Sequence, residues 1–221
     1  MTPIEAFELY RFYHSGDIET AALRGVSLKV QTGEFVAIMG PSGSGKSTLL
    51  SCLAGLEEPD GGYVQVIGAR MSRRSEAVRA ALRARHIGIL MQSGNLFEHL
   101  TLEGNIKLQM RLAKSNDGAT QVNRLFAQIG LSARRHAFPS QLSGGEVARG
   151  GLAVALCTNP QVLLADEPTG EVDADTEAHI LRRLLERRKA GMAMLIVTHS
   201  KGLAAQADRL LNIQDGRLIH V

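Results

Sequence analysis

The sequence predicts an α/β fold, in which a parallel sheet carries helices on its faces and is interrupted by a helical insertion. Three observations lead to this prediction. Nearly all-apolar runs at residues 34–39 and 162–165 are typical of strands buried on both faces. Helical patterns alternate with such strands along the chain, as in strand-helix-strand units. From about residue 93 to 159 the strand patterns stop, and apolar residues recur at spacings of three and four.

Length and composition limit the possible classes of protein. The 221 residues are 44% hydrophobic and 21% charged, which indicates one core-forming domain rather than a disordered chain. No apolar run approaches the roughly 20 residues of a membrane span, and the first residues lack the pattern of a secretion signal, so we expect neither. Because 25 basic side chains stand against 22 acidic ones, no nucleic-acid partner is expected.

The two cysteines, Cys52 and Cys157, stand far apart in apolar helical contexts. Neither has a second cysteine or a histidine at the spacing that metal sites use. We interpret them as reduced thiols in the core of a cytosolic protein, with a disulfide or a metal site as the alternative.

The first part of the chain is expected to form strands and helices around a glycine-rich loop. A turn at Thr32-Gly33 separates the first two strands, and the loop at 40–45 joins the second strand to a helix that ends near Gly55. A later arginine-rich segment, at 70–85, is interpreted as a solvated helix face rather than a surface for anionic lipid or nucleic acid. Its arginines are Arg70, Arg73, Arg74, Arg79, Arg83 and Arg85. The expected strands are at 27–31, 34–39, 62–67 and 86–92, and the expected helices at 46–56 and 72–85.

The insertion and the last part of the chain follow. Helices are expected at 102–113, 121–129, 144–157 and 176–189, and strands at 162–165, 194–198 and 209–213. We therefore expect a single domain of residues 1–221, with a core of about 1–92 and 160–221 and a helical subdomain of about 93–159. The apolar segment 96–108 is a candidate contact for a partner protein, and packing within the helical subdomain is the alternative.

A phosphate-binding loop is predicted at residues 40–48, Gly-Pro-Ser-Gly-Ser-Gly-Lys-Ser-Thr, directly after an apolar strand and before a helix. The glycines let backbone N–H groups turn toward phosphates, and the helix adds the positive end of its dipole. Lys46 should reach the β- and γ-phosphates, and Ser47 should ligate Mg²⁺. A plain Gly/Ser turn would not explain the Gly-Lys-Ser that ends the loop. The candidate nucleotide-binding residues are Gly40, Pro41, Ser42, Gly43, Ser44, Gly45, Lys46, Ser47 and Thr48.

Two acidic residues, Asp166 and Glu167, end the apolar strand at 162–165. A phosphate-binding loop needs a carboxylate to help hold the metal, and Asp166 is the natural candidate. Glu167 faces the other way on an extended chain, which suits it to act as general base toward the attacking water. The alternative is that both residues only begin the turn at 168–170.

A third motif, Leu-Ser-Gly-Gly-Glu at 142–146, opens a helix of the insertion. By itself it is a helix cap with exposed N–H groups that could bind an anion. Together with the two phosphate-site motifs, Gln92, Asp173 and His199, it makes the chain resemble the ATP-binding subunits of ABC transporters over essentially its whole length. The resemblance implies a P-loop NTPase with a RecA-like parallel-sheet core, an antiparallel β subdomain and an inserted α-helical signature subdomain.

The resemblance also implies roles for single residues. Tyr13 stands where the family keeps an aromatic that stacks on adenine, although Tyr10 or Phe12 could share that face. Gln92 matches the glutamine that contacts Mg²⁺ and water, and His199 the histidine that contacts the γ-phosphate. Asp173 matches the aspartate that communicates across the dimer. The expected catalytic residues are thus Glu167, His199, Gln92 and Lys46, and the expected metal ligands are Ser47, Gln92 and Asp166.

The resemblance further implies partners. In the family, two subunits dimerise head to tail around ATP and Mg²⁺, so that Ser143, Gly144 and Gly145 act on the nucleotide of a second copy. The dimer drives an integral membrane permease from the cytoplasmic face of the membrane. The chain looks most like subunits that serve lipoprotein-releasing, macrolide-exporting and FtsX-like permeases. Alternatives are a soluble ATPase of ribosome or DNA processes and an ATP-binding regulator with little hydrolysis.

Some positions depart from the family's pattern. Gly150-Gly151 stands inside the helix after the signature motif, where each glycine costs about 1 kcal/mol relative to alanine and weakens the expected rigidity. Ser200 follows His199 where aspartate is frequent, and Glu171-Val172 precedes Asp173. We therefore expect ATP binding to persist and turnover to be atypical.

Overall fold

The computed structural model describes residues 2–16, 18–93, 95–115, 119–170 and 172–220. The strands are β1 (Ile4–Ser15), β2 (Ile18–Val30), β3 (Phe35–Met39), β4 (Gly61–Val66), β5 (Ala69–Arg70), β6 (Ile87–Leu90), β7 (Val162–Asp166), β8 (Ala193–Val197), β9 (Arg209–Gln214) and β10 (Arg217–His220). The helices are α1 (Lys46–Leu53), α2 (Glu76–His86), α3 (Leu102–Leu112), α4 (Ala119–Ile129), α5 (Gly144–Leu156), α6 (Ala174–Lys189) and α7 (Lys201–Ala204), with 3₁₀ turns at Ser132–Arg134 and Pro139–Gln141.

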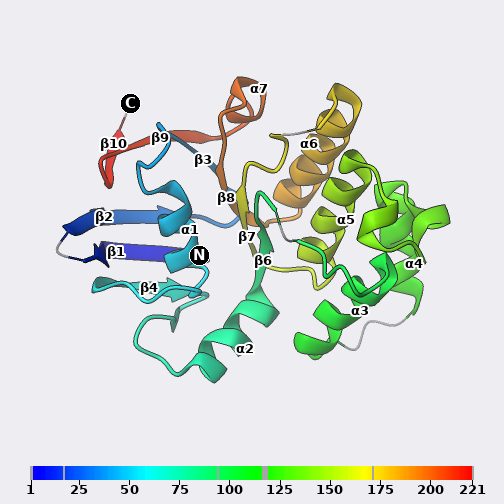
Figure 1. Ribbon diagram of the computed structural model, residues 1–221, viewed down its shortest axis with the longest axis horizontal. Helices are drawn as coiled ribbons and strands as arrows, with labels where there is room; N and C mark the ends of the chain where they lie inside the picture. Colours follow the sequence, from blue (N-terminus) through cyan, green and yellow to red (C-terminus); the bar gives the residue numbers. More distant parts are fainter. Residues whose placement is uncertain (1, 17, 94, 116–118, 171, 221) are drawn as a thin grey trace.

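A six-stranded sheet in the order β10-β9-β3-β8-β7-β6 forms the centre of the molecule (Figure 1). Neighbours from β9 to β6 are parallel, and only β10 pairs antiparallel. The predicted α/β fold with a parallel sheet is therefore confirmed. The carboxyl ends of parallel strands meet at one edge, which is where ligands bind in open α/β sheets.

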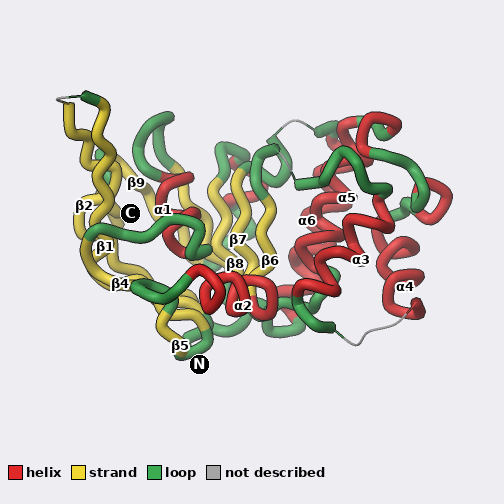
Figure 2. Tube along the Cα trace, turned by 60° about the horizontal axis from the view of Figure 1, so that its bottom comes forward, coloured by secondary structure: helices red, strands yellow, loops and turns green. Residues whose placement is uncertain are grey.

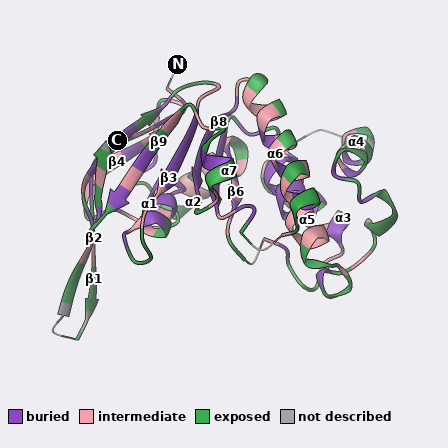
Figure 3. Ribbon diagram, turned by 90° about the horizontal axis from the view of Figure 1, so that it is seen from above, coloured by how far each residue is buried: buried purple, intermediate pink, exposed green. Residues whose placement is uncertain are grey.

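The central strands are buried on both faces, which explains their nearly all-apolar sequences (Figure 3). Alternate residues of β3 enter different cores. Val36 and Ile38 pack with α1 and the second sheet, whereas Phe35 and Ala37 pack with α5 and α6. Because both faces of β3 are packed, the start of the loop that follows this strand has a fixed position.

The second sheet is four-stranded and antiparallel, in the order β2-β1-β4-β5. Strand β1 and the first two thirds of β2 were not predicted, because register shifts interrupt their pairing near Leu9 and Arg11 and break the alternation of apolar and polar residues. The expected turn at Thr32-Gly33 is present, but it connects strands of different sheets rather than a hairpin.

Other element bounds differ for local reasons. The expected helix at 72–85 begins only at Glu76, because the Ser72 hydroxyl accepts a hydrogen bond from the Val64 N–H at 2.8 Å and Arg73 takes a positive φ of 58°. Strand β10 was not expected. It follows a two-residue turn at Asp215-Gly216, both with positive φ, which is a common hairpin signal.

Between β6 and β7 the described residues form helices and turns but no strand (Figure 2). Leu102, Ile106, Phe126 and Ala153 belong to their common core. Within the segment 96–108, the buried Leu96 also packs in this core. Phe97 of the same segment has a large exposed side chain, with 64% of its surface accessible.

The arginine-rich segment is held largely by contacts within the chain. Arg79 forms ion pairs with Glu58 and Glu76, and Arg83 with Glu76. Arg70 lies over the ring of Tyr63, 4.0 Å from its centroid. These contacts favour the interpretation of a solvated helix face. None of the described helices combines the length and the apolar character that a membrane crossing requires.

Both cysteine thiols should resist alkylation in the native protein. Cys52 and Cys157 are free and buried, and burial raises the pKa of each thiol to about 12. Because the thiolate is the reactive form, iodoacetamide at about pH 8 should modify neither residue until denaturant is added. Mass spectrometry with and without guanidinium chloride measures this. Rapid modification of the native chain would show that one thiol is accessible.

Candidate functional site

The loop at 40–45 turns sharply between β3 and α1, and neighbouring backbone leaves no room for a side chain at Gly40 or Gly45. A Cβ atom on Gly40 would lie 2.2 Å from the Ile213 carbonyl oxygen, and one on Gly45, at φ 103°, would lie 2.3 Å from the Ala22 carbonyl oxygen. The Lys46 ammonium folds back over the loop and donates hydrogen bonds to the carbonyls of Gly40 at 2.8 Å and Pro41 at 2.7 Å. The loop thus brings one cation to the start of α1.

Ser47 and Asp166 meet across 119 residues of sequence. The Ser47 hydroxyl donates to Asp166 Oδ2 at 2.7 Å, and Asp166, at the end of β7, is only 7% exposed. A hydroxyl and a carboxylate are hard oxygen donors, which Mg²⁺ prefers, and Mg²⁺ commonly completes its shell with water and substrate phosphate. The donor set at this point therefore fits Mg²⁺.

Glu167 follows Asp166 and is held in an uncommon backbone conformation. Its φ is 48°, a left-handed value that costs a non-glycine residue about 1–3 kcal/mol and often marks functional sites. Glu167 Oε2 accepts hydrogen bonds from the His199 N–H at 3.1 Å and the Thr198 hydroxyl at 3.3 Å. Glu167 Oε1 is buried without a hydrogen-bond partner and lies 3.6 Å from His199 Nε2. One carboxylate oxygen is thus free to accept a further proton donor.

These groups face one cleft of about 600 Å³. Gly40, Pro41 and Ser44 belong to the loop that bounds it, and Ser44 is buried beneath the cleft's surface. The residues anticipated from the sequence that line it are Tyr13, Ser42, Gly43, Gly45, Lys46, Ser47, Thr48, Gln92, Asp166, Glu167 and His199.

Tyr13 is the one of the three candidate aromatics that lines the cleft. Its hydroxyl donates to Glu57 Oε2 at 2.6 Å and lies 3.4 Å from the Thr48 hydroxyl oxygen, and burial together with Glu57 raises the Tyr13 pKa. The Arg11 guanidinium lies over the ring at 4.8 Å from its centroid. Tyr10 and Phe12 stack on each other instead. Tyr13 is therefore fixed at the edge of the cleft beside α1.

The signature motif forms a capping box at the start of α5. The Ser143 hydroxyl accepts from the Glu146 N–H at 3.3 Å, and Glu146 Oε2 accepts from the Ser143 N–H at 2.8 Å, which lowers the Glu146 pKa. Ser143 and Gly144 are exposed. Neither they nor Gly145 lines the cleft that holds Lys46.

Asp173 lies beside the signature motif and away from the cleft. It caps α6, accepting from the Thr176 N–H and from the Thr176 hydroxyl, each at 2.9 Å. Arg149 of α5 donates to the same hydroxyl at 3.1 Å, and a Cβ atom on Gly145 would lie 2.7 Å from it. The starts of α5 and α6 therefore pack directly together. Glu171 lies outside the described residues.

Gln92 lies between the two groups of residues. It lines both the main cleft and a smaller hollow of about 280 Å³ that Glu167 and Gly144 also line. Ser200, after His199, caps α7 and donates to Glu177 of α6 at 3.0 Å. The loops after β6, β7 and β8 are thus connected to α5 and α6 as well as to the cleft.

The two glycines after the signature motif serve close packing. Helix α5 runs without a break through Gly150 and Gly151. A Cβ atom on Gly150 would meet Leu102 at 2.8 Å, and one on Gly151 would meet the Cβ of Asn95 at 2.9 Å. Asn95 in turn bonds both backbone groups of Met91, next to Gln92. The glycines therefore let the segment after Gln92 lie directly on α5.

Gly151→Ala should lower the free energy of unfolding by about 1 kcal/mol. Overpacking costs about 1–3 kcal/mol, because the clash is with the Asn95 Cβ rather than a flexible side-chain end, and the gain in helix propensity of about 1 kcal/mol offsets part of it. The matched control is Gly202→Ala in α7, where the new methyl group makes only a 3.6 Å contact. Urea denaturation measures both. Equal stability of the two variants would contradict the packing argument.

Several residues of the cleft had no sequence motif. Thr20, Ala21, Ala22 and Arg24 come from β2, whose strand pattern was not recognised. Asp215 and Gly216 come from the turn before β10. Gly216 is held there by hydrogen bonds from the Arg24 N–H to its carbonyl and from its N–H to the Ser44 carbonyl. The Asp-Gly pair between two apolar runs was the available signal.

Comparison with known proteins agrees with this geometry. The family described as "ABC transporter" matches residues 23–170. The chain is 37% identical to the ABC transporter ATP-binding protein MJ1508 of Methanocaldococcus jannaschii, over 99% of this chain and 98% of that protein. It is 40% identical to the macrolide export ATP-binding/permease protein MacB of Hyphomonas neptunium, over 99% of this chain but only 35% of that protein.

Solved structures give the same answer. The dimeric post-hydrolysis state of the ATP-binding cassette MJ0796 bound to ADP and Pi has a TM-score of 0.92 to this chain, at 29% identity and 98% coverage of both chains. The phosphate-binding loop, the paired acidic residues and the capped signature helix occur here within that fold. The chain belongs to the ABC transporter ATP-binding family and is an ATPase of that family.

Proposed function

We propose that the chain is the ATP-hydrolysing subunit of an ABC transporter complex, which dimerises on ATP and drives a separate membrane permease. The observation that carries the proposal is the meeting of Lys46, the Ser47–Asp166 pair and the Glu167–His199 pair at one cleft. These are a phosphate-binding cation, a hard-oxygen metal site and a carboxylate with one free oxygen. Phosphoryl transfer to water needs all three.

The roles of the residues follow from where their atoms lie. The Lys46 ammonium would exchange its two carbonyl partners for the β- and γ-phosphates, while Ser42–Thr48 backbone N–H groups and the start of α1 bind phosphate oxygens. Ser47 and Asp166, with Gln92, would hold Mg²⁺, which neutralises charge on the phosphates when bound. Glu167 would accept a proton from the attacking water, and His199 would contact the γ-phosphate. Tyr13 would stack on adenine.

A second copy of the chain would complete each site. Ser143, Gly144, Gly145 and Asp173 lie together outside the cleft, and the exposed N–H groups at the start of α5 are suited to bind an anion. We propose that they face the nucleotide of the partner copy. The dimeric state of the MJ0796 cassette supports this arrangement.

The division into a core of about 1–92 and 160–221 and a helical subdomain of about 93–159 fits this function, because a permease could then move one part relative to the other. The exposed Phe97 is the candidate contact with that permease. The macrolide export proteins that this chain resembles carry ATP-binding and permease parts in one longer chain, which supports export. Lipoprotein or lipid extraction and mechanical transmission are the alternatives, each at the cytoplasmic face of a membrane.

Phosphate release with and without the membrane partner tests the proposal. The tagged chain is expressed in its own host, the integral membrane protein that copurifies is identified, and both are reconstituted in nanodiscs. We expect the partner to raise steady-state phosphate release, and Phe97→Ala to reduce that stimulation while leaving ATP binding unchanged. Recovery of ribosomes or DNA in place of a membrane protein would contradict the proposal, as would ATP binding without phosphate release.

A further inference from the structure

A second pocket, of about 510 Å³, lies among α4, α5 and α6 and shares no lining residue with the nucleotide cleft. Helix α5 packs against both of the other helices (Figures 1 and 2). The pocket lies along α4 and the last turns of α5 and α6, whereas Ser143 and Asp173 lie where α5 and α6 begin. It is thus separate from every residue of the proposed catalytic function.

The floor of the pocket is apolar. Its lining includes Ile129 of α4 and Leu152, Ala153 and Leu156 of α5, all buried. Leu125 lies beside them. A volume between about 300 and 1,000 Å³ is typical of small-molecule sites, which combine an apolar lining with a few polar groups. The polar groups here are concentrated at the rim.

The rim carries an excess of positive charge. Arg124, Arg183 and Arg187 line the pocket together with one carboxylate, Glu186. That carboxylate is already paired with Arg183 at 2.7 Å. Among the residues that the structure describes, neither Arg124 nor Arg187 has an acidic partner within 4.0 Å. Two guanidinium groups at the rim are therefore not neutralised.

Arg187 is the more constrained of the two. It is half-buried, and its Nε is buried without a hydrogen-bond partner among the described residues, as is the Nε of Arg183. Burial lowers the Arg187 pKa. A desolvated charge without a partner destabilises the protein, and an anion would supply both the charge and the acceptors. A guanidinium group binds carboxylate or phosphate through two parallel hydrogen bonds.

We propose that this pocket binds a small amphiphilic anion, whose carboxylate or phosphate head contacts Arg187 and Arg124 and whose short apolar tail covers Leu152 and its neighbours. Both parts of the ligand follow from the lining, since the floor offers no charge and the rim offers two free cations. A bound ligand would join the helical insertion to α6 of the core at the ends opposite the signature motif.

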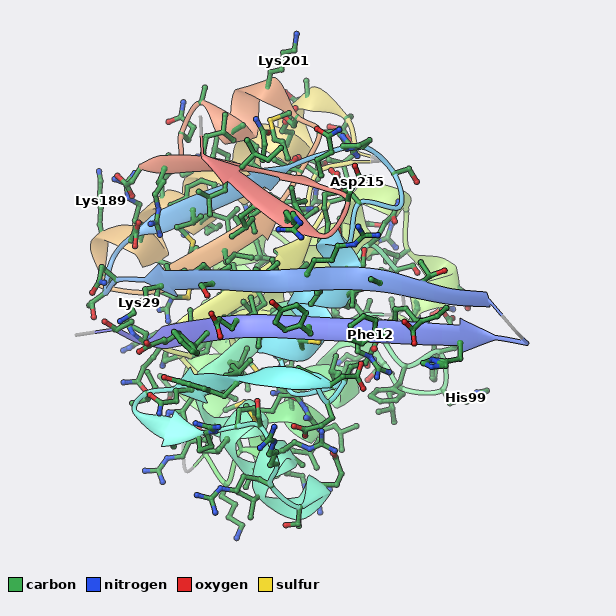
Figure 4. The ribbon with its side chains drawn as sticks, turned by 90° about the vertical axis from the view of Figure 1, so that its left-hand side faces the viewer. Phe12, Lys29, His99, Lys189, Lys201 and Asp215 are labelled. Carbon is green, nitrogen blue, oxygen red and sulfur yellow. The ribbon has the colours of Figure 1, made fainter. Side chains whose placement is uncertain are left out.

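The alternative is that Arg187 only stabilises the end of α6. Arg187, Arg188 and Lys189 all lie in the last turn, where cations interact favourably with the helix dipole. Lys189 is exposed, and its side chain projects from the edge of the molecule (Figure 4). Lys189 lies in the same last turn of α6 as Arg187, so it interacts with the same end of the helix dipole, but it does not line the pocket. Lys189→Gln is therefore the matched control for Arg187→Gln.

Isothermal titration of the whole chain with octanoate and with octyl phosphate tests the proposal. Inorganic phosphate supplies the head alone and octyl glucoside a neutral head on the same tail. We expect at least one amphiphilic anion to bind without nucleotide, and its affinity to fall by at least about tenfold in Arg187→Gln but not in Lys189→Gln. ATP affinity should stay the same in both variants. The preferred anion shows whether the site takes a carboxylate or a phosphate.

Arg124→Gln keeps the test decisive if Arg187→Gln does not fold, because Arg124 is exposed and its loss should also weaken binding. The proposal is wrong if neither anion binds, if octyl glucoside binds as tightly as the anions, or if Lys189→Gln weakens binding as much as Arg187→Gln. It is also wrong if only an acidic peptide binds, since the pocket would then be a protein contact.

Discussion

Lys46→Ala should remove measurable ATP binding. The Lys46 ammonium is the cation that the loop at 40–45 brings to the cleft, and its two present partners are carbonyls of the same loop. Hydrogen bonds from a charged donor are worth about 1.5–3 kcal/mol each, so losing contacts to two phosphates should weaken binding by about a hundredfold or more. Titration with a fluorescent ATP analogue in the presence of Mg²⁺ measures the loss.

Lys201→Ala is the control for the loss of a positive charge. Lys201 is exposed at the start of α7 and points away from the molecule (Figure 4). Its removal should leave ATP affinity unchanged. Because Lys46→Ala also frees the Gly40 and Pro41 carbonyls, thermal unfolding of the variant should be measured alongside binding. A folded Lys46→Ala protein with the affinity of the natural chain would contradict the assignment of this loop to phosphate.

The sequence alone was sufficient for the parts of the site that depend on local chain geometry. The loop at 40–45 could be recognised because its glycines and the following Lys46-Ser47 form a short motif of fixed spacing between a strand and a helix. Asp166 follows a strand buried on both faces, so its place at the sheet's carboxyl edge could be inferred. In both cases a short stretch of residues carried the whole signal.

Other parts depend on contacts between distant segments and could not be inferred. Tyr13 was expected beside adenine only from the family resemblance, because the strand that carries it has an irregular register that hides its alternation of apolar and polar residues. Its contact with Glu57, 44 residues away, leaves no motif. The glycines at 150 and 151 suggested a weakened helix, whereas they admit Leu102 and Asn95 to the surface of α5. Such packing leaves no motif in the segment itself, because the residue that requires the glycine lies elsewhere in the chain.

The predicted site residues fall into two groups, and only one of them lines the nucleotide cleft of its own chain. Glu167 and Lys46 face the same cleft, but Ser143 caps α5 and Asp173 caps α6 at a separate surface, where Arg149 of α5 donates to the Thr176 hydroxyl of α6. Helix caps and close packing hold these residues in place, although they do not line the nucleotide cleft of their own chain. Under the proposed function, these residues bind the nucleotide of a second copy, and a variant that stops hydrolysis should make that dimer observable.

Glu167→Gln should keep ATP binding while lowering the rate of hydrolysis by about a hundredfold to ten-thousandfold, the usual contribution of a general base. The glutamine amide oxygen can still accept the hydrogen bonds from the His199 N–H and the Thr198 hydroxyl, so the loop should keep its shape. The amide cannot take a proton from water, and it removes a negative charge from the γ-phosphate's surroundings.

The ATP-bound dimer of Glu167→Gln should therefore persist long enough to be measured. Sedimentation at saturating Mg-ATP should show the dimer for this variant, and mostly monomer when ADP replaces ATP. Glu98→Gln is the control, because Glu98 is exposed and lies outside the cleft, and it should hydrolyse ATP at the rate of the natural chain. Persistent monomer at saturating Mg-ATP would count against the shared site, whereas a dimer that still releases phosphate rapidly would show that another group is the base. The two measurements thus separate the dimer from the chemistry, since the proposal assigns dimerisation to Ser143 and Gly144 of the second copy and hydrolysis to the carboxylate of Glu167.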